Sequence, residues 1–278
     1  MNLSKNLEGK LERFILSLKN KKVIVAFSGG VDSTLLAFLS KKFAKDTLLV
    51  TEHSILYPEG EIELASQFAL KYDISQIILE RNPLDDDDFK LNPINRCYIC
   101  KKGLYNEIIE IRDDFDFDII LDGSNFDDLQ DFRPGLQALK ELDIFTPYIE
   151  FKIKKQEIRE ICKYYNLDVQ SKPSMACFSS RIPYNQVINE KKLNLIREGE
   201  RFLKQNFNLK QLRVRLHDES LARIEFLKSD LPKILTKENL QKIEKKFKDL
   251  GFNYITIDIE GFRSGSMNLS IKKNEETF

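Results

Sequence analysis

Short apolar runs alternate with longer amphipathic segments along the first part of the chain. The runs are rich in Val, Ile and Leu, as expected of buried strands, and lie at 21–27, 47–53, 74–80 and 117–125. Apolar residues at helical spacing fill the intervals, at 34–45, 58–72 and 101–115. Strands that alternate with helices predict an α/β fold, in which a parallel sheet carries helices on both faces.

The pattern changes after a helix predicted at 154–167. A loop rich in Ser and Pro follows at 168–186, and it is the best candidate for a domain boundary. Beyond it the pattern predicts a small α+β domain with helices at 190–205 and 236–250 and strands at 211–217, 221–227 and 254–260. We therefore expect a large domain at 1–185 and a small one at 186–278, the latter for substrate binding or oligomer contacts.

The composition narrows the class of protein. Hydrophobic residues make up 42% and charged residues 32% of the 278 residues, which is typical of a soluble globular chain. No apolar run reaches the length of a membrane span, and the amphipathic N-terminal segment lacks the apolar core of a signal peptide. We therefore expect a cytoplasmic protein without a membrane partner, whose four cysteines are reduced.

The charges are unevenly distributed, although the formal net charge is zero. Residues 1–189 hold 25 Lys and Arg against 30 Asp and Glu, and residues 190–278 hold 19 against 14. The mild positive excess in the C-terminal part suits a small anionic substrate and is a weak indication of nucleic-acid binding. The acidic run DDDD at 85–88 is interpreted as a solvated loop.

The string SGGVDS directly follows the first predicted strand. Gly29 and Gly30 allow a tight turn whose N–H groups face a phosphate, and the next helix adds its positive end. Ser28 and Ser33 add hydroxyl donors, and Asp32 can hold a magnesium ion through oxygen. The alternative is an ordinary strand-to-helix turn. The string resembles the PP-loop of ATP pyrophosphatases, which implies an adenine-nucleotide α-hydrolase-like sheet and cleavage of ATP between its α and β phosphates.

The cysteines raise the question of a metal. Cys97 and Cys100 form one C-x-x-C pair, and no His follows at a zinc-finger interval. Cys162 lies on the apolar face of a predicted helix and is interpreted as a small core residue. Cys177 lies in the boundary loop, four residues before Arg181, whose guanidinium would favour the thiolate. The thiols alone leave open an iron–sulfur cluster, a three-cysteine zinc site with an outside ligand, and a redox dithiol pair.

Four longer strings resemble the LarE family, ATP-dependent sulfur transferases of nickel-pincer cofactor synthesis. They are RCYICKKGLY (96–105), LDGSNFDDLQDFRPGLQAL (121–139), KPSMACFSSRIPY (172–184) and GFRSGSMNLS (261–270). Asn185 departs from the family pattern, which usually has Gly there. Some members give up the sulfur of one cysteine at the position of Cys177, and others resemble enzymes with a three-cysteine cluster. The resemblance therefore implies a 4Fe–4S cluster on Cys97, Cys100 and Cys177, with one iron open to hydrosulfide.

The resemblance also implies the substrate, a pyridinium biscarboxylate mononucleotide. ATP with Mg²⁺ would adenylate a carboxylate, and sulfur would then attack the acyl carbon. Arg213 and Arg215 match family arginines of an anion pocket, the alternative being a solvated strand face. Arg181 would serve either the cluster loop or the substrate. Gly123 matches a nucleotide-binding position of the family. Asp127, Asp131 and Arg133 also match the family, and their role is substrate binding, closure of the active site or only an ion-paired loop.

Other functions stay open from the sequence. The family forms hexamers, so a homo-oligomer is expected, and nothing identifies the source of sulfide. A PP-loop tRNA thiolase with a cluster is the strongest rival enzyme, but zero net charge and a pI near 6.8 favour a partner other than nucleic acid. An amidotransferase would need a glutaminase segment, and the chain shows none. The remaining alternatives are a sacrificial Cys177 sulfur donor and an iron–sulfur or nucleotide sensor without turnover.

Overall fold

The computed structural model describes residues 3–171, 176–209, 211–263 and 265–268. The chain forms two compact units. Unit 1 is Met1–Ser54, Glu59–Asn82 and Asn95–Met175, and unit 2 is Ile55–Pro58, Pro83–Ile94 and Ala176–Phe278. The units therefore change at residue 176, and unit 2 also takes two short segments from the N-terminal half. The domain boundary expected after residue 185, and the roles assigned to each domain, stay predictions.

Unit 1 contains the predicted parallel sheet. Its strands are β1 (Lys22–Ala26), β2 (Asp46–His53), β3 (Ser75–Glu80) and β4 (Ile119–Leu121), in the order β3-β2-β1-β4, and each neighbouring pair is parallel. From β1 the chain adds β2 and β3 on one side of the sheet and then crosses to add β4 on the other side of β1. The strand order therefore switches between β1 and β4. Open α/β sheets bind ligands beyond the carboxyl ends of strands at such a point.

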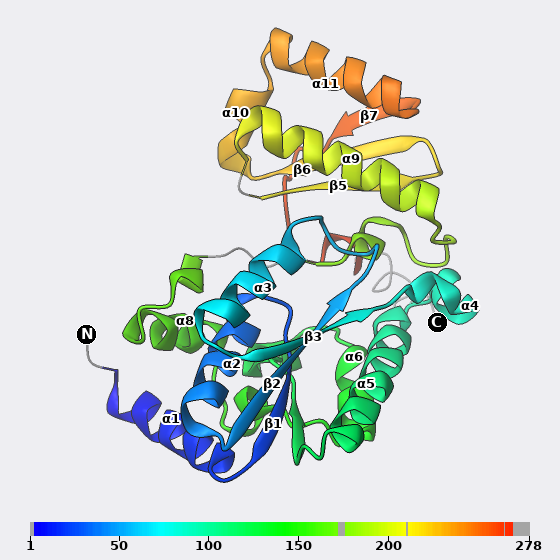
Figure 1. Ribbon diagram of the computed structural model, residues 1–278. Helices are drawn as coiled ribbons and strands as arrows, with labels where there is room; N and C mark the ends of the chain where they lie inside the picture. The colour runs from blue at the N-terminus through cyan, green and yellow to red at the C-terminus, as the bar shows by residue number, and fades with distance from the viewer. Residues whose placement is uncertain (1–2, 172–175, 210, 264, 269–278) are drawn as a thin grey trace, which may run out of the picture. The chain divides into compact units, whose positions relative to one another are not determined.

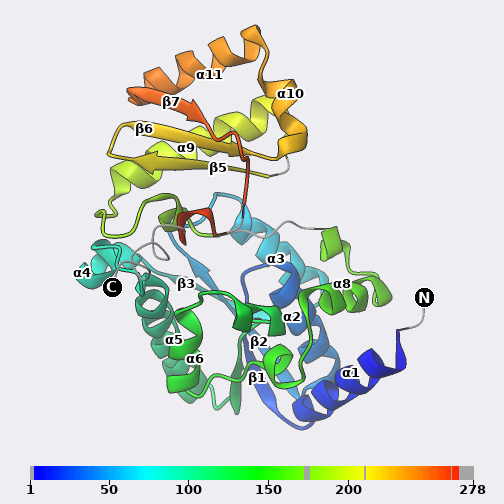
Figure 2. The same ribbon diagram turned by 180° about the vertical axis from the view of Figure 1, so that it is seen from behind.

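Helices cover both faces of this sheet, which confirms the predicted fold class (Figure 1). Seen from behind, α5 and α6 lie on one side and α1, α2 and α8 on the other (Figure 2). Alternate strand residues explain the two layers, since Val23 and Val25 join one apolar cluster and Ile24 the other. The helix bounds are α1 Lys5–Leu18, α2 Val31–Phe43, α3 Glu61–Lys71, α5 Arg96–Asp114, α6 Gly135–Glu141, α7 Pro147–Glu150 and α8 Lys155–Tyr164.

Unit 2 is the predicted small α+β arrangement. Strands β5 (Leu212–His217) and β6 (Leu221–Phe226) are antiparallel, and β7 (Tyr254–Ile257) runs parallel to β6. One face carries α9 (Glu190–Phe207) and α11 (Lys237–Leu250), with the short α10 (Leu231–Ile234) between β6 and α11. Gly199 lets the two long helices approach closely, because a Cβ there would lie 3.2 Å from the Phe247 ring and 3.5 Å from Val214.

Two local features differ from or extend the sequence interpretation. The acidic run is solvated as expected, but it is not a plain loop, because the Asp86 carboxylate caps helix α4 (Asp87–Lys90) by accepting from the Phe89 N–H. Asn185 has a φ of 64°, the left-handed conformation in which Gly is best and Asn is tolerated. None of the helices in the described ranges is long and apolar enough to cross a membrane.

Candidate active site

The PP-loop joins the end of β1 to α2 in unit 1. Gly29 has a φ of 65°, so the turn needs the freedom of glycine, and Gly30 is the N-cap of α2 without a side-chain cap. The hydroxyl of Ser33 lies 3.3 Å from the Ser28 N–H, 3.2 Å from the Ser28 hydroxyl and 3.2 Å from the Gly30 carbonyl. The two serines therefore brace the turn, and the first turn of a 13-residue helix is available to an anion.

Asp32 lies in the first turn of α2 and has one satisfied and one unsatisfied oxygen. Its Oδ2 pairs with the Lys155 ammonium at the start of α8, whereas its Oδ1 is buried and has no hydrogen-bond partner among the described residues. Burial raises the pKa of Asp32, and the charge of Lys155 offsets part of that rise. An orphaned buried carboxylate oxygen beside a phosphate-type loop fits a divalent cation, so the donor chemistry agrees with the predicted magnesium ligand.

Gly123 brings the end of β4 against the PP-loop. A Cβ at this position would lie 3.2 Å from the Ser33 backbone nitrogen and 3.4 Å from the Asp32 carbonyl carbon, so a side chain would push the two segments apart. The residue before it, Asp122, accepts hydrogen bonds from Lys101 at 2.8 Å and Tyr105 at 2.5 Å. Burial opposes ionisation, but Lys101 and the hydrogen bonds outweigh it and lower the pKa of Asp122 to about 2. A fixed carboxylate therefore stands beside the loop.

The acidic segment after β4 divides into two roles. The Asp127 carboxylate accepts from the Lys155 backbone N–H at 2.9 Å, and so holds the start of the helix that carries the partner of Asp32. Arg133 pairs with Asp128 at 2.8 Å and with Asp131 at 3.6 Å. The contacts of Arg133 and Asp131 fit the ion-paired loop, whereas Asp127 is linked to the PP-loop through one lysine. Their roles toward the substrate stay predictions.

Cys97 and Cys100 lie at the start of α5 in unit 1. The helix begins at Arg96, so the two thiols are one turn apart on one helix face, with Cys97 exposed and Cys100 half-buried. Cys177 lies in unit 2 and is half-buried, so the three-cysteine set draws on both units. Among the described residues no group of three His, Cys, Asp or Glu side chains is arranged to hold a metal ion. The cluster therefore stays a prediction.

Arg81 fixes the helix that carries the cysteine pair. Its guanidinium donates to Glu107 at 2.7 Å, to Glu52 at 3.2 Å and to the Cys100 carbonyl at 3.4 Å. Gly103 leaves room for it, since a Cβ there would come within 2.2 Å of a guanidinium nitrogen. Cys162, by contrast, is fully buried in the core, and burial raises the pKa of its thiol to about 12, which confirms it as a core residue.

Arg181 holds the loop that carries Cys177. Its guanidinium donates to the carbonyls of Ala176 at 2.6 Å and Cys177 at 2.9 Å, and forms a buried two-point pair with Glu200 at 2.9 and 3.2 Å. Burial would raise the pKa of Glu200, but the charge and hydrogen bond of Arg181 lower it. In unit 2, therefore, Arg181 contacts the backbone of the cysteine loop, which was one of its two predicted roles.

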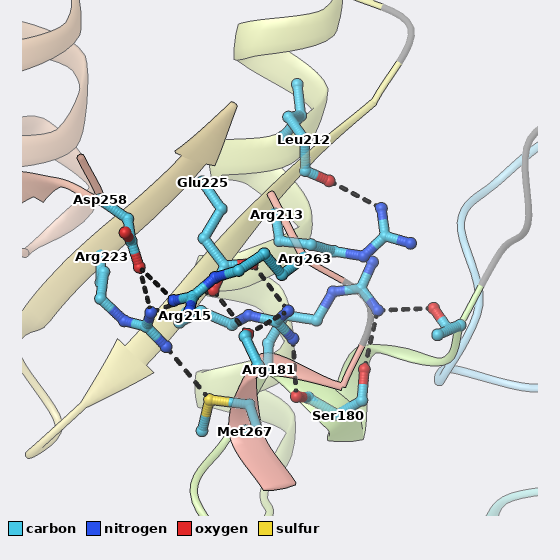
Figure 3. A network of polar contacts seen from close by, with 12 residues as sticks. Ser180, Arg181, Leu212, Arg213, Arg215, Arg223, Glu225, Asp258, Arg263 and Met267 are labelled. Atoms are coloured by element: carbon cyan, nitrogen blue, oxygen red, sulfur yellow. Dashed lines mark hydrogen bonds and ion pairs between the residues drawn. The ribbon is translucent and has the colours of Figure 1, made fainter. Parts of the chain in front are cut away.

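Arg213 and Arg215 lie on the face of β5 opposite Val214, which packs toward α9. Their exposed fractions are only 7% and 4%, so the alternative of a solvated strand face is wrong. Arg215 donates to Glu225 at 2.8 Å, to the Ser266 hydroxyl at 3.0 Å and to the Ser180 carbonyl at 3.0 Å. Figure 3 shows this network, which continues through Arg223 to Asp258 at 2.5 Å.

The arginines of this network repel one another. Burial, then the charges of Arg181 and Arg215, lower the pKa of Arg213 to about 10, so it keeps its proton at neutral pH. The buried carboxylates of Glu200 and Glu225 pair with Arg181 and Arg215 and offset this repulsion. The binding of an anionic substrate by Arg213 and Arg215 stays a prediction.

Sequence reasoning missed several of these residues. Lys155 is 123 positions from Asp32, and a lysine at the start of a helix carries no signal of its own. Glu200 and Glu225 lie in amphipathic segments where a carboxylate is ordinary, so only the fold reveals that they balance buried arginines. Lys101 and Asp122 fall inside two of the family strings, which could have identified them.

The comparisons with known proteins decide the family. No family model matches the chain. It is 35% identical over 272 residues to an uncharacterized protein of Synechocystis sp., covering 96% of this chain and 100% of that protein. It is 30% identical over 274 residues, 96% of each chain, to the pyridinium-3,5-bisthiocarboxylic acid mononucleotide synthase of Lactiplantibacillus plantarum. The chain belongs to the LarE family.

More distant similarity agrees with this family. The chain is 27% identical over 224 residues to a tRNA-specific 2-thiouridylase of Clostridium perfringens, over 66% of this chain and 62% of that protein. Membership of the LarE family identifies the chain as an enzyme of ATP-dependent sulfur transfer, and it confirms the resemblance seen in the sequence. The described parts of all four LarE strings contribute to the sites above, and residues 172–175, 264, 269 and 270 of these strings lie outside the described ranges.

Proposed function

We propose that this LarE-family chain converts carboxylates of a pyridinium biscarboxylate mononucleotide to thiocarboxylates, with ATP as the activating substrate. The observation that carries the proposal is the PP-loop with the orphaned Asp32 oxygen, together with full-length similarity to a bisthiocarboxylic acid mononucleotide synthase. Oxide is a very poor leaving group, so a carboxylate must be adenylated before sulfur can replace its oxygen. The proposal therefore needs one nucleotide site and one anion site.

The PP-loop residues would bind and orient ATP. The backbone of Gly29 and Gly30 and the hydroxyls of Ser28 and Ser33 would face the phosphates, and Gly123 lets the end of β4 lie directly against the loop. Asp32 would hold Mg²⁺, which supplies charge neutralisation at the phosphates when bound. The substrate carboxylate attacks the α-phosphorus, the bond to the bridging oxygen breaks, and pyrophosphate leaves with that electron pair.

The anion pocket of unit 2 would take the substrate phosphate. Arg213 and Arg215 are buried, close together and already held by protein contacts, so they are preorganised for a phosphate. Arg181 would act on the cysteine loop, since its donors go to the Ala176 and Cys177 carbonyls. Burial and mutual repulsion of these arginines support an anionic ligand.

The proposed sulfur carrier is a 4Fe–4S cluster held by the thiolates of Cys97, Cys100 and Cys177. When bound, it would offer one iron to exogenous hydrosulfide and so spare the cysteines from being consumed. Thiolates are the usual ligands of such clusters, and the two thiols of α5 share one helix face. Attack by hydrosulfide on the acyl carbon would expel AMP with the C–O electron pair and leave a thiocarboxylate. Attack by the Cys177 thiolate would expel AMP in the same way but leave a thioester, and the thiocarboxylate would be released only when the Cβ–Sγ bond breaks by β-elimination, with loss of the Cα proton, to leave dehydroalanine.

Turnover tests the proposed reaction. Anaerobic protein, ATP, Mg²⁺, sulfide and the biscarboxylate mononucleotide should release pyrophosphate only when the mononucleotide is present, and mass spectrometry should find sulfur in place of carboxylate oxygen. A sensor would release no pyrophosphate. A tRNA thiolase would release it with tRNA and not with the mononucleotide, and either result would overturn the proposal.

Iron analysis tests the carrier. Anaerobically purified wild-type chain should hold about four irons and four acid-labile sulfides, and Cys97→Ala should lose them while Cys162→Ala, in the core, keeps them. No iron after reconstitution would rule out the cluster. A chain lighter by one hydrogen sulfide after one turnover would instead identify Cys177 as a sacrificial sulfur donor.

A further inference from the structure

The C-terminal segment, residues 261–263 and 265–268, is fixed to the arginine network of unit 2 at both of its ends. Gly261 has a φ of 71°, and a Cβ there would lie 2.7 Å from the Phe226 carbonyl, so only glycine fits this turn. The same carbonyl accepts from the Phe262 N–H at 2.7 Å. At the other end, the Ser266 hydroxyl donates to Glu225 at 2.7 Å and accepts from Arg215.

This anchoring places an aromatic ring beside the anion pocket. The Arg213 guanidinium carbon lies 5.1 Å from the centroid of the Phe262 ring, within the range of a cation–π contact. Arg213 is 7% exposed, whereas Phe262 is half-buried. Phe262 is therefore a half-buried aromatic side chain held next to a buried guanidinium group.

We propose that Phe262 is a substrate-specificity residue, on which the cationic pyridinium ring of the mononucleotide stacks while Arg213 and Arg215 bind its phosphate. The inference rests on the proposed function and extends it from the phosphate to the base. Aromatic faces attract cations, and a ring joined through one ribose to a bound phosphate stays near the side chains that hold that phosphate. The site would thus select heteroaromatic cations over neutral bases.

Three ligands distinguish the contribution of the ring to binding from that of the phosphate. Nicotinamide mononucleotide carries the pyridinium cation, its reduced form carries a neutral ring of similar shape, and ribose 5-phosphate carries no ring. Calorimetry on the full chain should show that Phe262→Leu lowers the affinity for nicotinamide mononucleotide by about 10-fold. The same substitution should change the affinity for ribose 5-phosphate by less than about twofold. Phe262→Tyr should keep wild-type affinity, and the reduced mononucleotide should bind wild type more weakly than the oxidised one.

The controls separate failure of the inference from failure of the proposed function. Phe202→Leu changes a phenylalanine of α9 whose ring contacts Phe207 instead, and it should bind all three ligands like wild type. If Phe262→Leu lowers the affinity for all three ligands equally, Phe262 acts only by holding Arg213 in place, and the inference is overturned. If wild type binds ribose 5-phosphate as tightly as the oxidised mononucleotide, the inference alone fails. If wild type binds none of them, the anion pocket fails as well.

Discussion

Asp32→Asn should release pyrophosphate at about one thousandth of the wild-type rate or less, because an uncharged amide group replaces the carboxylate proposed to hold magnesium. The change keeps the size of the side chain and leaves an oxygen for Lys155, so the loop should keep its shape. Since burial disfavours the charge of Asp32, the variant should unfold at a temperature no lower than that of wild type. Pyrophosphate release and thermal unfolding on the same preparation measure both.

The matched control is Asp73→Asn. Asp73 is a surface carboxylate that pairs with Lys41, and its φ of 51° suits asparagine equally well. That variant should release pyrophosphate like wild type. If Asp32→Asn keeps more than about a tenth of the wild-type rate, the orphaned oxygen does not hold the metal.

Arg181→Met should lower the free energy of unfolding by about 3–5 kcal/mol, because it leaves the buried Glu200 carboxylate without its partner. Arg181 and Glu200 are 1% and 3% exposed, so water cannot replace the lost contact. The variant also removes the hydrogen bonds to the Ala176 and Cys177 carbonyls, so amide hydrogen exchange in this loop should become faster. Urea unfolding measures the first effect and hydrogen-exchange mass spectrometry the second.

A second substitution tests the cause. Adding Glu200→Gln removes the buried charge but keeps an acceptor for the Val214 N–H, so the double variant should recover part of the lost stability. Lys242→Ala, at an exposed pair on α11, should leave unfolding unchanged. A double variant no more stable than Arg181→Met would mean that the loop carbonyls, and not the unpaired carboxylate, account for the loss.

The strands and long helices could be predicted because their signals are local. Strand β2 was expected at 47–53 and lies at Asp46–His53, since apolar residues that are buried on both faces leave an unbroken run. Helix α11 was expected at 236–250 and lies at Lys237–Leu250, where Thr236 caps its start and Gly251 ends it in the left-handed conformation. In both elements the residues that determine the structure lie inside or next to it.

The rest depends on contacts between distant residues. Segments 55–58 and 83–94 belong to unit 2, where the Phe178 N–H donates to the Leu56 carbonyl and the Asn185 N–H to that of Asn92. Backbone hydrogen bonds of this kind can be made by almost any residue type, so the sequence does not predict them. The PP-loop was recognisable because its glycines are demanded by local geometry, whereas Lys155 and Glu200 act only through partners brought to them by folding.

The Lys155–Asp32 pair has a consequence for the PP-loop before it binds a metal ion. Many metal sites built from acidic groups alone cannot form until the metal arrives, because the ligand carboxylates repel one another or stay desolvated. Here an ammonium group of the chain already balances the one carboxylate of the PP-loop. The PP-loop therefore does not need a metal ion to balance the charge of Asp32, and the conformation of the loop is compatible with the absence of both nucleotide and metal.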